Sequence, residues 1–221
     1  MSDGAKYRAY IFDLDGTLTD SREAICHGVI HSLESIGVDG ITPGEVIPWI
    51  GRPLIEIFPH FMRRAGVRRE VDDELYRRLL ASYLEGHNAR FPDGVHIYPG
   101  VPETLERLRR EGARLAIATT KHEDAALFVT EGVGLKALVD TVCGTDKDDP
   151  VKPDPFVLQK ALDRLGVEPP DALAVGDTAS DVLAARAAGC AAAAVAYGFG
   201  GEVELRAAGP DLWLERITEI P

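Results

Sequence analysis

Short apolar runs recur along the chain, and in its second half they alternate with amphipathic stretches of helical length. The runs predict buried strands over residues 8–12, 114–118, 139–143, 173–175 and 191–195. The stretches between them predict helices over residues 102–110, 122–131, 155–165 and 179–188. Strands that alternate with helices indicate right-handed βαβ units, so we expect an α/β fold with a Rossmann-like parallel sheet covered on both faces.

The interval between the first and second predicted strands breaks this alternation. It is far longer than one crossover helix requires, and its pattern predicts three helices, over residues 22–36, 53–65 and 71–86. We therefore predict a helical cap domain over residues 20–90, inserted into a core domain formed by residues 1–19 and 91–221. Ligands of open α/β sheets bind beyond the carboxyl ends of the strands. Because the insertion leaves from such an end, we expect it to act as a lid.

Composition narrows the possible partners. The chain has 221 residues, 45% of them hydrophobic and 27% charged, as in a globular protein, and its formal net charge is -12. So acidic a surface repels phosphate backbones and anionic bilayers, which argues against nucleic acid or a membrane as the main partner. An anionic substrate would then need a site that is locally positive.

The cysteines and the N-terminal segment indicate the compartment. Cys26, Cys143 and Cys190 are scattered, without a Cys-X-X-Cys pair or a Cys/His cluster, which fits a reducing environment. The first residues lack a signal-peptide pattern, and no apolar run is long enough to span a bilayer. We expect a cytoplasmic protein, either a monomer or a homodimer.

Polar and acidic residues follow four of the predicted strands. They are Asp13, Asp15, Gly16 and Thr17 after the first strand, Thr119, Thr120 and Lys121 after the second, Lys152 after the third, and Asp177 and Asp181 after the fourth. Taken singly, each cluster is equally typical of a turn, a helix cap or a solvated charge. The first does not match a calcium loop, because Leu18 and Ala24 stand where such a loop needs glycine and glutamate.

Parallel strands bring these clusters to one edge of the sheet. Four carboxylates gathered there would repel one another and raise one another's pKa values, so they call for a cation. Oxygen ligands with few carboxylates suit Mg²⁺, which keeps several waters and binds substrate phosphate. Lys152 adds a fixed positive charge. The sequence therefore predicts a site for a metal and a phosphoryl group.

Four segments carry a family resemblance. FDLDGTLTDS, ATTK, VKPDP and GDTASD resemble, in this order, the four motifs of the haloacid dehalogenase-like hydrolase superfamily, and the resemblance extends over nearly the whole chain. It implies a haloacid dehalogenase-like core with a helical cap. Asp15 favours phosphoryl transfer, because the dehalogenases of the superfamily lack an aspartate two positions after the nucleophile. Thr17 and the TTK segment look more like the phosphoglycolate phosphatase-type branch.

The resemblance also implies roles. Asp13 would be the nucleophile that forms an aspartyl-phosphate, and Asp15 would be the general acid and then the general base. Lys152 would pair with Asp13, and Thr119 would hold a phosphate oxygen. The metal, Mg²⁺, would be bound by the Asp13 carboxylate, the Asp15 carbonyl and Asp177, with Asp181 acting directly or through a water.

The remaining predicted contacts concern the substrate. Gly16, Thr17 and Thr120 would line the phosphate site, and Arg52, in a segment similar to the IGxPL loop of related caps, would bind the far end of the substrate. The alternative for Arg52 is a surface arginine beside a turn. The sequence thus favours a Mg²⁺-dependent phosphatase of a small phosphorylated metabolite, without identifying that metabolite. A β-phosphoglucomutase-like mutase, a pyrophosphatase or nucleotidase of the same superfamily, and a receiver-like phosphoacceptor switch remain alternatives.

Overall fold

The computed structural model describes residues 5–221, which separate into two compact units. The first unit contains the chain up to Asp20 together with Ile97–Pro221, and the second is Ser21–His96. The first unit is thus built from two segments of the chain, with the second unit inserted between them.

A six-stranded parallel sheet forms the centre of the first unit. Its spatial order is β5-β4-β1-β6-β7-β8, with β1 paired to β4 on one side and to β6 on the other. The six strands are β1 (Ala9–Phe12), β4 (Arg114–His122), β5 (Thr141–Thr145), β6 (Ala172–Gly176), β7 (Ala191–Val195) and β8 (Leu212–Leu214). This is the predicted Rossmann-like sheet. A separate two-stranded ribbon joins β2 (Thr19–Asp20) to β3 (His96–Ile97).

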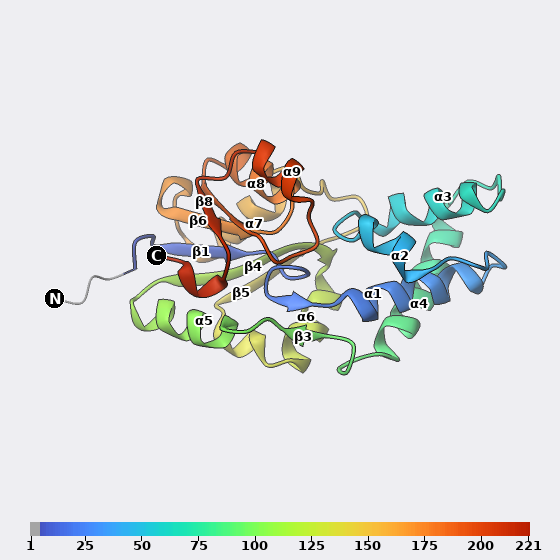
Figure 1. Ribbon diagram of the computed structural model, residues 1–221, viewed down its shortest axis with the longest axis horizontal. Coiled ribbons are helices and arrows are strands. Elements are labelled where there is room, and N and C mark those ends of the chain that lie inside the picture. The colour runs from blue at the N-terminus through green and yellow to red at the C-terminus, as the bar shows by residue number, and fades with distance from the viewer. Residues whose placement is uncertain (1–4) are drawn as a thin grey trace. The chain divides into compact units, whose positions relative to one another are not determined.

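Helices cover both faces of the sheet. In Figure 1, α7 and α8 lie on one face, and α5 and α6 lie on the other. The helices of this unit are α5 (Val101–Arg110), α6 (Glu123–Gly132), α7 (Phe156–Leu165), α8 (Ala179–Ala188) and α9 (Glu202–Ala207), with short 3-10 turns at Leu135–Leu138, Pro169–Asp171 and Ile217–Glu219. The pattern of a parallel sheet between two helical layers explains why its central strands are apolar on both sides.

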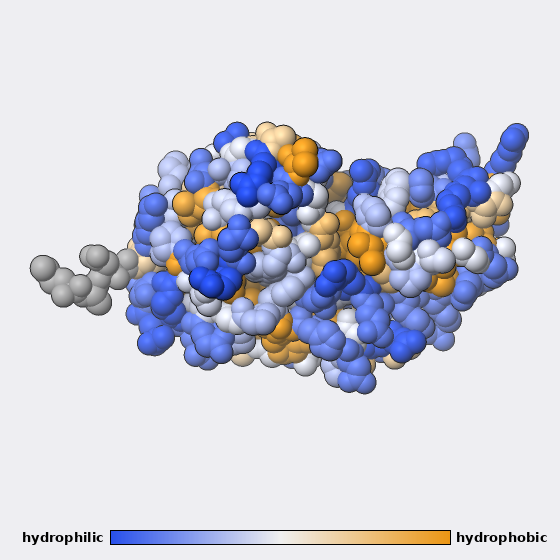
Figure 2. All heavy atoms as spheres, viewed as in Figure 1, coloured by the Kyte–Doolittle hydropathy of each residue, from blue (hydrophilic) through white to orange (hydrophobic). Residues whose placement is uncertain are grey.

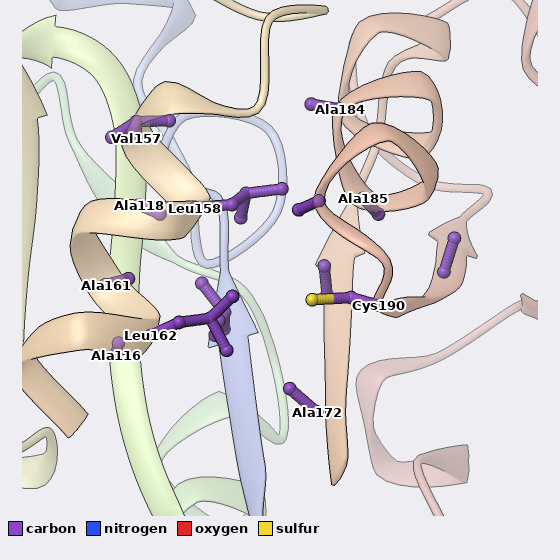
Figure 3. Packing of buried hydrophobic residues seen from close by; sticks show 14 of the residues in the cluster. Ala116, Ala118, Val157, Leu158, Ala161, Leu162, Ala172, Ala184, Ala185 and Cys190 are labelled. Carbon is purple, nitrogen blue, oxygen red and sulfur yellow. The ribbon is translucent and has the colours of Figure 1, made fainter. Parts of the chain in front are cut away.

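Small side chains allow α7 and α8 to pack closely on the sheet. Figure 3 shows Ala161 of α7 over Ala116 and Ala118 of β4, whereas Leu158 of the same helix points toward α8. Ala184 and Ala185 of α8 are fully buried in the same cluster. Ala192 and Ala194 of β7 belong to this core as well, so small side chains on this face of the strand meet the closely packed helices.

The second unit is helical. It contains α1 (Arg22–Glu34), α2 (Pro43–Val46), a 3-10 turn at Ile47–Trp49, α3 (Leu54–Arg64) and α4 (Asp73–Asn88). Helix α1 packs along α4, and the hydroxyl of Ser32 donates to the carbonyl of Leu79, 2.7 Å away. Phe58 and Phe61 of α3 are buried in the core of this unit.

Most predicted elements differ from the observed ones by one to three residues at their ends. The strand expected to end at Ala118 runs on to His122, with a register shift against β5 between these two residues. The strand expected over 139–143 begins at Thr141 instead. Strand β8, helix α9 and the β2–β3 ribbon were not predicted, because each is too short for a periodic pattern.

The surface is largely polar. The face in Figure 2 is mostly hydrophilic, with hydrophobic residues scattered across it. Phe128, Leu183 and Val203 are large hydrophobic residues that are exposed. Within residues 5–221, no helix is both long and apolar enough to cross a bilayer.

Candidate active site

Strand β1 delivers Asp13 to the carboxyl edge of the sheet. All four residues of the strand are buried, and the backbone N–H of Asp13 still donates to the carbonyl of Val175 in β6, 2.9 Å away. The position of Asp13 is therefore fixed by the ladder between β1 and β6.

Lys152 lies at the centre of the buried polar groups. Its ammonium donates to Asp13 Oδ1 at 2.7 Å, to Asp181 Oδ1 at 2.6 Å and to the carbonyl of Ala118 at 2.8 Å. These three bonds use all three donors of the ammonium, and the side chain is 4% exposed. The lysine thus ties the ends of β1 and β4 to the first turn of α8.

Asp177, directly after β6, faces the loop that follows β1. Its Oδ1 accepts from the hydroxyl of Thr17 at 3.0 Å, and its Oδ2 accepts from the backbone N–H of Phe199 at 2.7 Å. The carboxylate packs against Gly16, whose φ of 97° and lack of a side chain permit this approach; a Cβ at Gly16 would overlap it.

Asp15 has a charged partner that sequence reasoning did not identify. The ammonium of Lys121, near the end of β4, lies 2.9 Å from Asp15 Oδ2, and both side chains are nearly buried, at 8% and 11% exposed. An ion pair this enclosed is screened little by solvent and holds the carboxylate in a defined place. A second lysine therefore stands beside the pair of aspartates.

Thr119 and Thr120 lie near the end of β4, directly before Lys121. Thr119 is buried, and its hydroxyl accepts from the backbone N–H of Lys121 at 3.3 Å. The carbonyl of Thr120 accepts from the hydroxyl of Thr145 at 2.8 Å, which joins the ends of β4 and β5. These bonds fix the end of β4, which carries Lys121.

Asp181 is both a capping residue and a partner of Lys152. Its Oδ2 accepts from the N–H of Thr178 at 3.0 Å and from the Thr178 hydroxyl at 2.6 Å, which completes a capping box at the start of α8. Its Oδ1 faces Lys152. The helix cap expected of Asp177 is thus made by Thr178 and Asp181 instead, and the two oxygens of Asp181 serve different partners.

The charges in this cluster do not balance. Burial raises the pKa of Asp13 well above its ordinary value; Lys152 opposes this shift, whereas Asp181 and Asp177 add to it. Burial and then the charge of Asp181 raise the pKa of Asp177 to about 7. Burial would lower the pKa of Lys152, but Asp13 and Asp181 outweigh it and raise that pKa above its ordinary value. One ammonium is too little positive charge for three neighbouring carboxyl groups.

This excess of negative charge fits a divalent cation. Among residues 5–221, no three His, Cys, Asp or Glu side chains form a ready-made metal cluster. Mg²⁺ does not require one, because it is commonly held by one or two carboxylates, waters and substrate phosphate. Asp13 and Asp177, with the Asp15 carbonyl next to Gly16, offer oxygen ligands of this kind. Asp181 lies nearby, because Lys152 contacts both Asp13 and Asp181.

Arg52 belongs to the second unit. It lies in the turn before α3, its guanidinium is 4.8 Å from the centre of the Trp49 ring, and its Nη1 is 3.6 Å from Glu56 Oε2. The side chain is 57% exposed. Its proposed contact with the substrate therefore stays a prediction.

Sequence reasoning missed one further segment that contributes to the site. Residues 196–201, with the sequence AYGFGG, follow β7 and supply the N–H of Phe199 to Asp177 and the hydroxyl of Tyr197 to the carbonyl of Thr17. A cluster of glycines and aromatic residues after a strand was the available signal, because glycine often marks close approach of a backbone.

Comparison with known proteins places these groups in a family. A family model described as haloacid dehalogenase-like hydrolase matches residues 10–195. A pyrophosphatase PpaX from Bacillus velezensis is 35% identical over 96% of this chain and 94% of its own, and a PpaX from Halalkalibacterium halodurans is 31% identical over 95% and 93%.

Solved structures agree on the fold. A haloacid dehalogenase-like hydrolase from Bacteroides fragilis superposes with a TM-score of 0.86, at 28% identity, over 98% of this chain and 100% of its own. A protein from Haemophilus somnus 129PT, described as a predicted phosphoglycolate phosphatase, gives a TM-score of 0.85 at 24% identity over 98% and 97% of the two chains. With its sheet order and its Asp13–Lys152–Asp181 contacts, the chain belongs to the haloacid dehalogenase-like hydrolases.

Proposed function

We propose that this hydrolase is a Mg²⁺-dependent phosphatase that acts on a small phosphorylated metabolite through an aspartyl-phosphate on Asp13. The observation that carries the proposal is the contact of Lys152 with both Asp13 and Asp181, in a buried cluster with too many carboxyl groups for its positive charge. Asp15 distinguishes phosphoryl transfer from dehalogenation, because an alcohol leaving group needs a proton and a halide does not.

The first step is attack on phosphorus. Lys152 holds Oδ1 of Asp13, so Oδ2 is the oxygen that forms the new bond to phosphorus as the bond to the leaving oxygen breaks. Asp15 gives its proton to that leaving oxygen. The fixed charge of Lys152 stabilises the negative charge that spreads over the transferring group.

The second step is hydrolysis. Asp15, now a carboxylate, takes a proton from a water whose oxygen attacks phosphorus, and the bond to Asp13 breaks to release phosphate. Lys121 lies beside Asp15 and keeps the carboxylate in place between the two steps. Mg²⁺, when bound by Asp13, Asp177 and the Asp15 carbonyl, supplies positive charge for phosphate binding.

Pyrophosphate is the substrate that the relatives favour. The two relatives compared above carry the name pyrophosphatase PpaX, and each aligns over more than nine-tenths of both chains. Phosphoglycolate is the second candidate, because a neighbour in fold carries that description. Sugar phosphates and nucleoside monophosphates would meet the same core residues, and we expect the second unit, including Arg52, to select among them.

The decisive test is Asp13→Asn, assayed with p-nitrophenyl phosphate and pyrophosphate in the presence and absence of Mg²⁺. We expect the wild type to release phosphate only with Mg²⁺, and the variant to lose at least about 10³-fold in kcat with unchanged thermal stability. Full activity of Asp13→Asn would overturn the nucleophile. The wild type is also incubated with a sugar phosphate. An isomerised product would then indicate a mutase, and a stable phosphoprotein without turnover would indicate a switch.

A further inference from the structure

Residues 196–201 wrap around Asp177. This segment, AYGFGG, leaves the end of β7 and leads into α9. The N–H of Phe199 donates to Asp177 Oδ2 at 2.7 Å. The loop after β7 thus contacts the side chain of Asp177, which stands at the end of the neighbouring strand β6.

Two glycines permit this close approach. A Cβ on Gly198 would overlap the side chain of Asp177, and a Cβ on Gly200 would overlap the Asp177 carbonyl oxygen. Gly198 does not have the left-handed backbone that would itself demand glycine. Glycine is therefore needed at position 198 because the side chain of Asp177 occupies the space that a Cβ would fill.

Tyr197 connects the same loop to the other side of Asp177. Its hydroxyl donates to the carbonyl of Thr17 at 2.8 Å, and the hydroxyl of Thr17 donates to Asp177 Oδ1 at 3.0 Å. The Tyr197 ring packs on the ring of Tyr98 at 4.6 Å between centres, and the N–H of Tyr98 donates to the carbonyl of Leu18. The loop after β1 and the loop after β7 are thereby joined.

We propose that residues 196–201 are a positioning element that sets the Asp177 carboxylate in the orientation needed to bind Mg²⁺. The inference rests on the proposed function in taking Asp177 as a metal ligand. One oxygen is fixed directly by Phe199, the other is fixed through Thr17 and Tyr197, and Gly198 leaves a single place for the side chain. Groups that orient a ligand in this way commonly change metal affinity by 10- to 100-fold when they are lost.

The first test is Gly198→Ala, with Gly44→Ala as its matched control. Both glycines have ordinary backbone angles, but an added Cβ at Gly44 meets nothing within 4 Å. Mg²⁺ is titrated calorimetrically into the intact chain without substrate. We expect Gly198→Ala to weaken Mg²⁺ binding about 10-fold or more and Gly44→Ala to leave it unchanged.

The second test covers a Gly198→Ala protein that does not fold. Tyr197→Phe removes one hydroxyl–carbonyl bond next to Asp177. Tyr10→Phe, the control, removes a part-buried hydroxyl outside the site that donates to the carbonyl of Pro221 and accepts from the N–H of Tyr7. Both variants lose a hydrogen bond, so both lose some thermal stability. We expect weaker Mg²⁺ binding, by about threefold, for Tyr197→Phe alone.

The outcomes separate this inference from the proposed function. Weaker Mg²⁺ binding in the loop variants, together with recovery of their kcat at saturating Mg²⁺, supports the positioning role. Folded loop variants that bind Mg²⁺ like the wild type overturn it, as does a wild type that binds no Mg²⁺. A wild type that binds Mg²⁺ but hydrolyses neither a phosphate ester nor pyrophosphate overturns the proposed function and leaves the positioning role intact.

Discussion

At the scale of single residues, the two aspartates after β1 have different lysine partners. Asp13 contacts Lys152, which also holds Asp181, whereas Asp15 contacts Lys121 at the end of β4. Two carboxylates separated by one residue are thereby held by different parts of the fold. This separation suits a nucleophile and a proton carrier, because each needs its own orientation.

The role of Asp15 predicts a leaving-group effect. In Asp15→Asn, transfer from p-nitrophenyl phosphate to Asp13 should still occur, because nitrophenolate leaves without a proton, whereas transfer from an alkyl phosphate should not. Stopped-flow absorbance should therefore show a burst of about one equivalent of nitrophenolate, followed by turnover at least about 10²-fold slower than in the wild type. Equal losses with both substrates and no burst would contradict the role of Asp15 as acid.

Most of the candidate site could be predicted at this scale, and the reason is topological. Asp13, Lys152, Asp177 and Asp181 each follow a recognisable strand, and parallel strands bring their carboxyl ends to one edge. Lys121 also follows a predicted strand, but its pairing with Asp15 was not predicted, and neither was the contact of Phe199 with Asp177. The first depends on how far β4 extends, and the second acts through a backbone N–H, which any residue but proline provides.

At the scale of elements, Glu123 joins α6, β5 and α7. Its carboxylate lies 2.6 Å from the ammonium of Lys160, 3.0 Å from the guanidinium of Arg164 and 3.2 Å from the N–H of Gly144. Burial works to raise the pKa of Glu123, but these three donors outweigh it and lower the pKa to about 2. Glu123 follows Lys121 by two residues, so these contacts of Glu123 also fix the end of β4, where Lys121 contacts Asp15.

Glu123 predicts a pH dependence of stability. Because its pKa is lower in the folded chain than in the unfolded one, its stabilisation is present above about pH 4.5 and is lost as the pH falls toward 2. Glu123→Gln should lower the free energy of unfolding by about 1–2 kcal/mol at pH 7, with the difference shrinking at pH 3. Urea denaturation at both pH values measures this. Glu202→Gln, which breaks an exposed pair with Arg206, is the control and should change little.

The close packing of α8 predicts sensitivity to added volume. Ala185 is fully buried in the core beneath α8, whereas Ala187, two residues later on the same helix, is exposed. Ala185→Leu should destabilise the chain by about 1–3 kcal/mol, because a packed core has no room for the extra carbons. Ala187→Leu should stay within about 0.5 kcal/mol of the wild type. Thermal unfolding of the two variants compares them, and equal midpoints would show that the helix can shift outward at no cost.

Apolar runs predicted where the central strands lie, but they did not predict the polar residues by which a strand extends beyond its apolar run. Strand β7 has the predicted bounds because all its residues are apolar and the run lies between Gly189, which ends α8, and the glycine-rich segment that begins at Ala196. Strand β4 continues through Thr119, Thr120 and Lys121, where only the backbone ladder, not the side-chain pattern, marks a strand. Such polar continuations at a strand end are typical of functional sites.

At the scale of the whole molecule, an acidic chain is proposed to bind an anion. The net charge is -12, yet the charges nearest Asp13 and Asp15 include the ammonium groups of Lys152 and Lys121. Both lysines are nearly buried, so dissolved salt screens them little, whereas it screens the charges on the surface. The surface charge therefore opposes the approach of the substrate, whereas its final binding depends on these two ammonium groups together with Mg²⁺, because carboxyl groups outnumber the lysines in the site.

This opposition predicts a salt effect on the rate of encounter. Raising the ionic strength from about 10 to about 150 mM should raise kcat/KM for a phosphate substrate by about two- to fivefold, because salt screens the surface repulsion more than the buried attraction. The kcat at saturating substrate should change little. Steady-state kinetics at constant Mg²⁺ measure both constants, and a fall of kcat/KM with salt would show that the lysines dominate approach as well.

The small ribbon formed by β2 and β3 has a consequence for how such a chain diversifies. Because Thr19–Asp20 pairs with His96–Ile97, the place where the chain leaves the first unit and the place where it returns are hydrogen-bonded neighbours. Residues 21–95 therefore form a single loop closed by the β2–β3 pair, and the entropy of closing a loop changes only slowly with its length. The inserted segment can thus change in length and sequence at little cost to the first unit, while Asp13 and its partners keep their places.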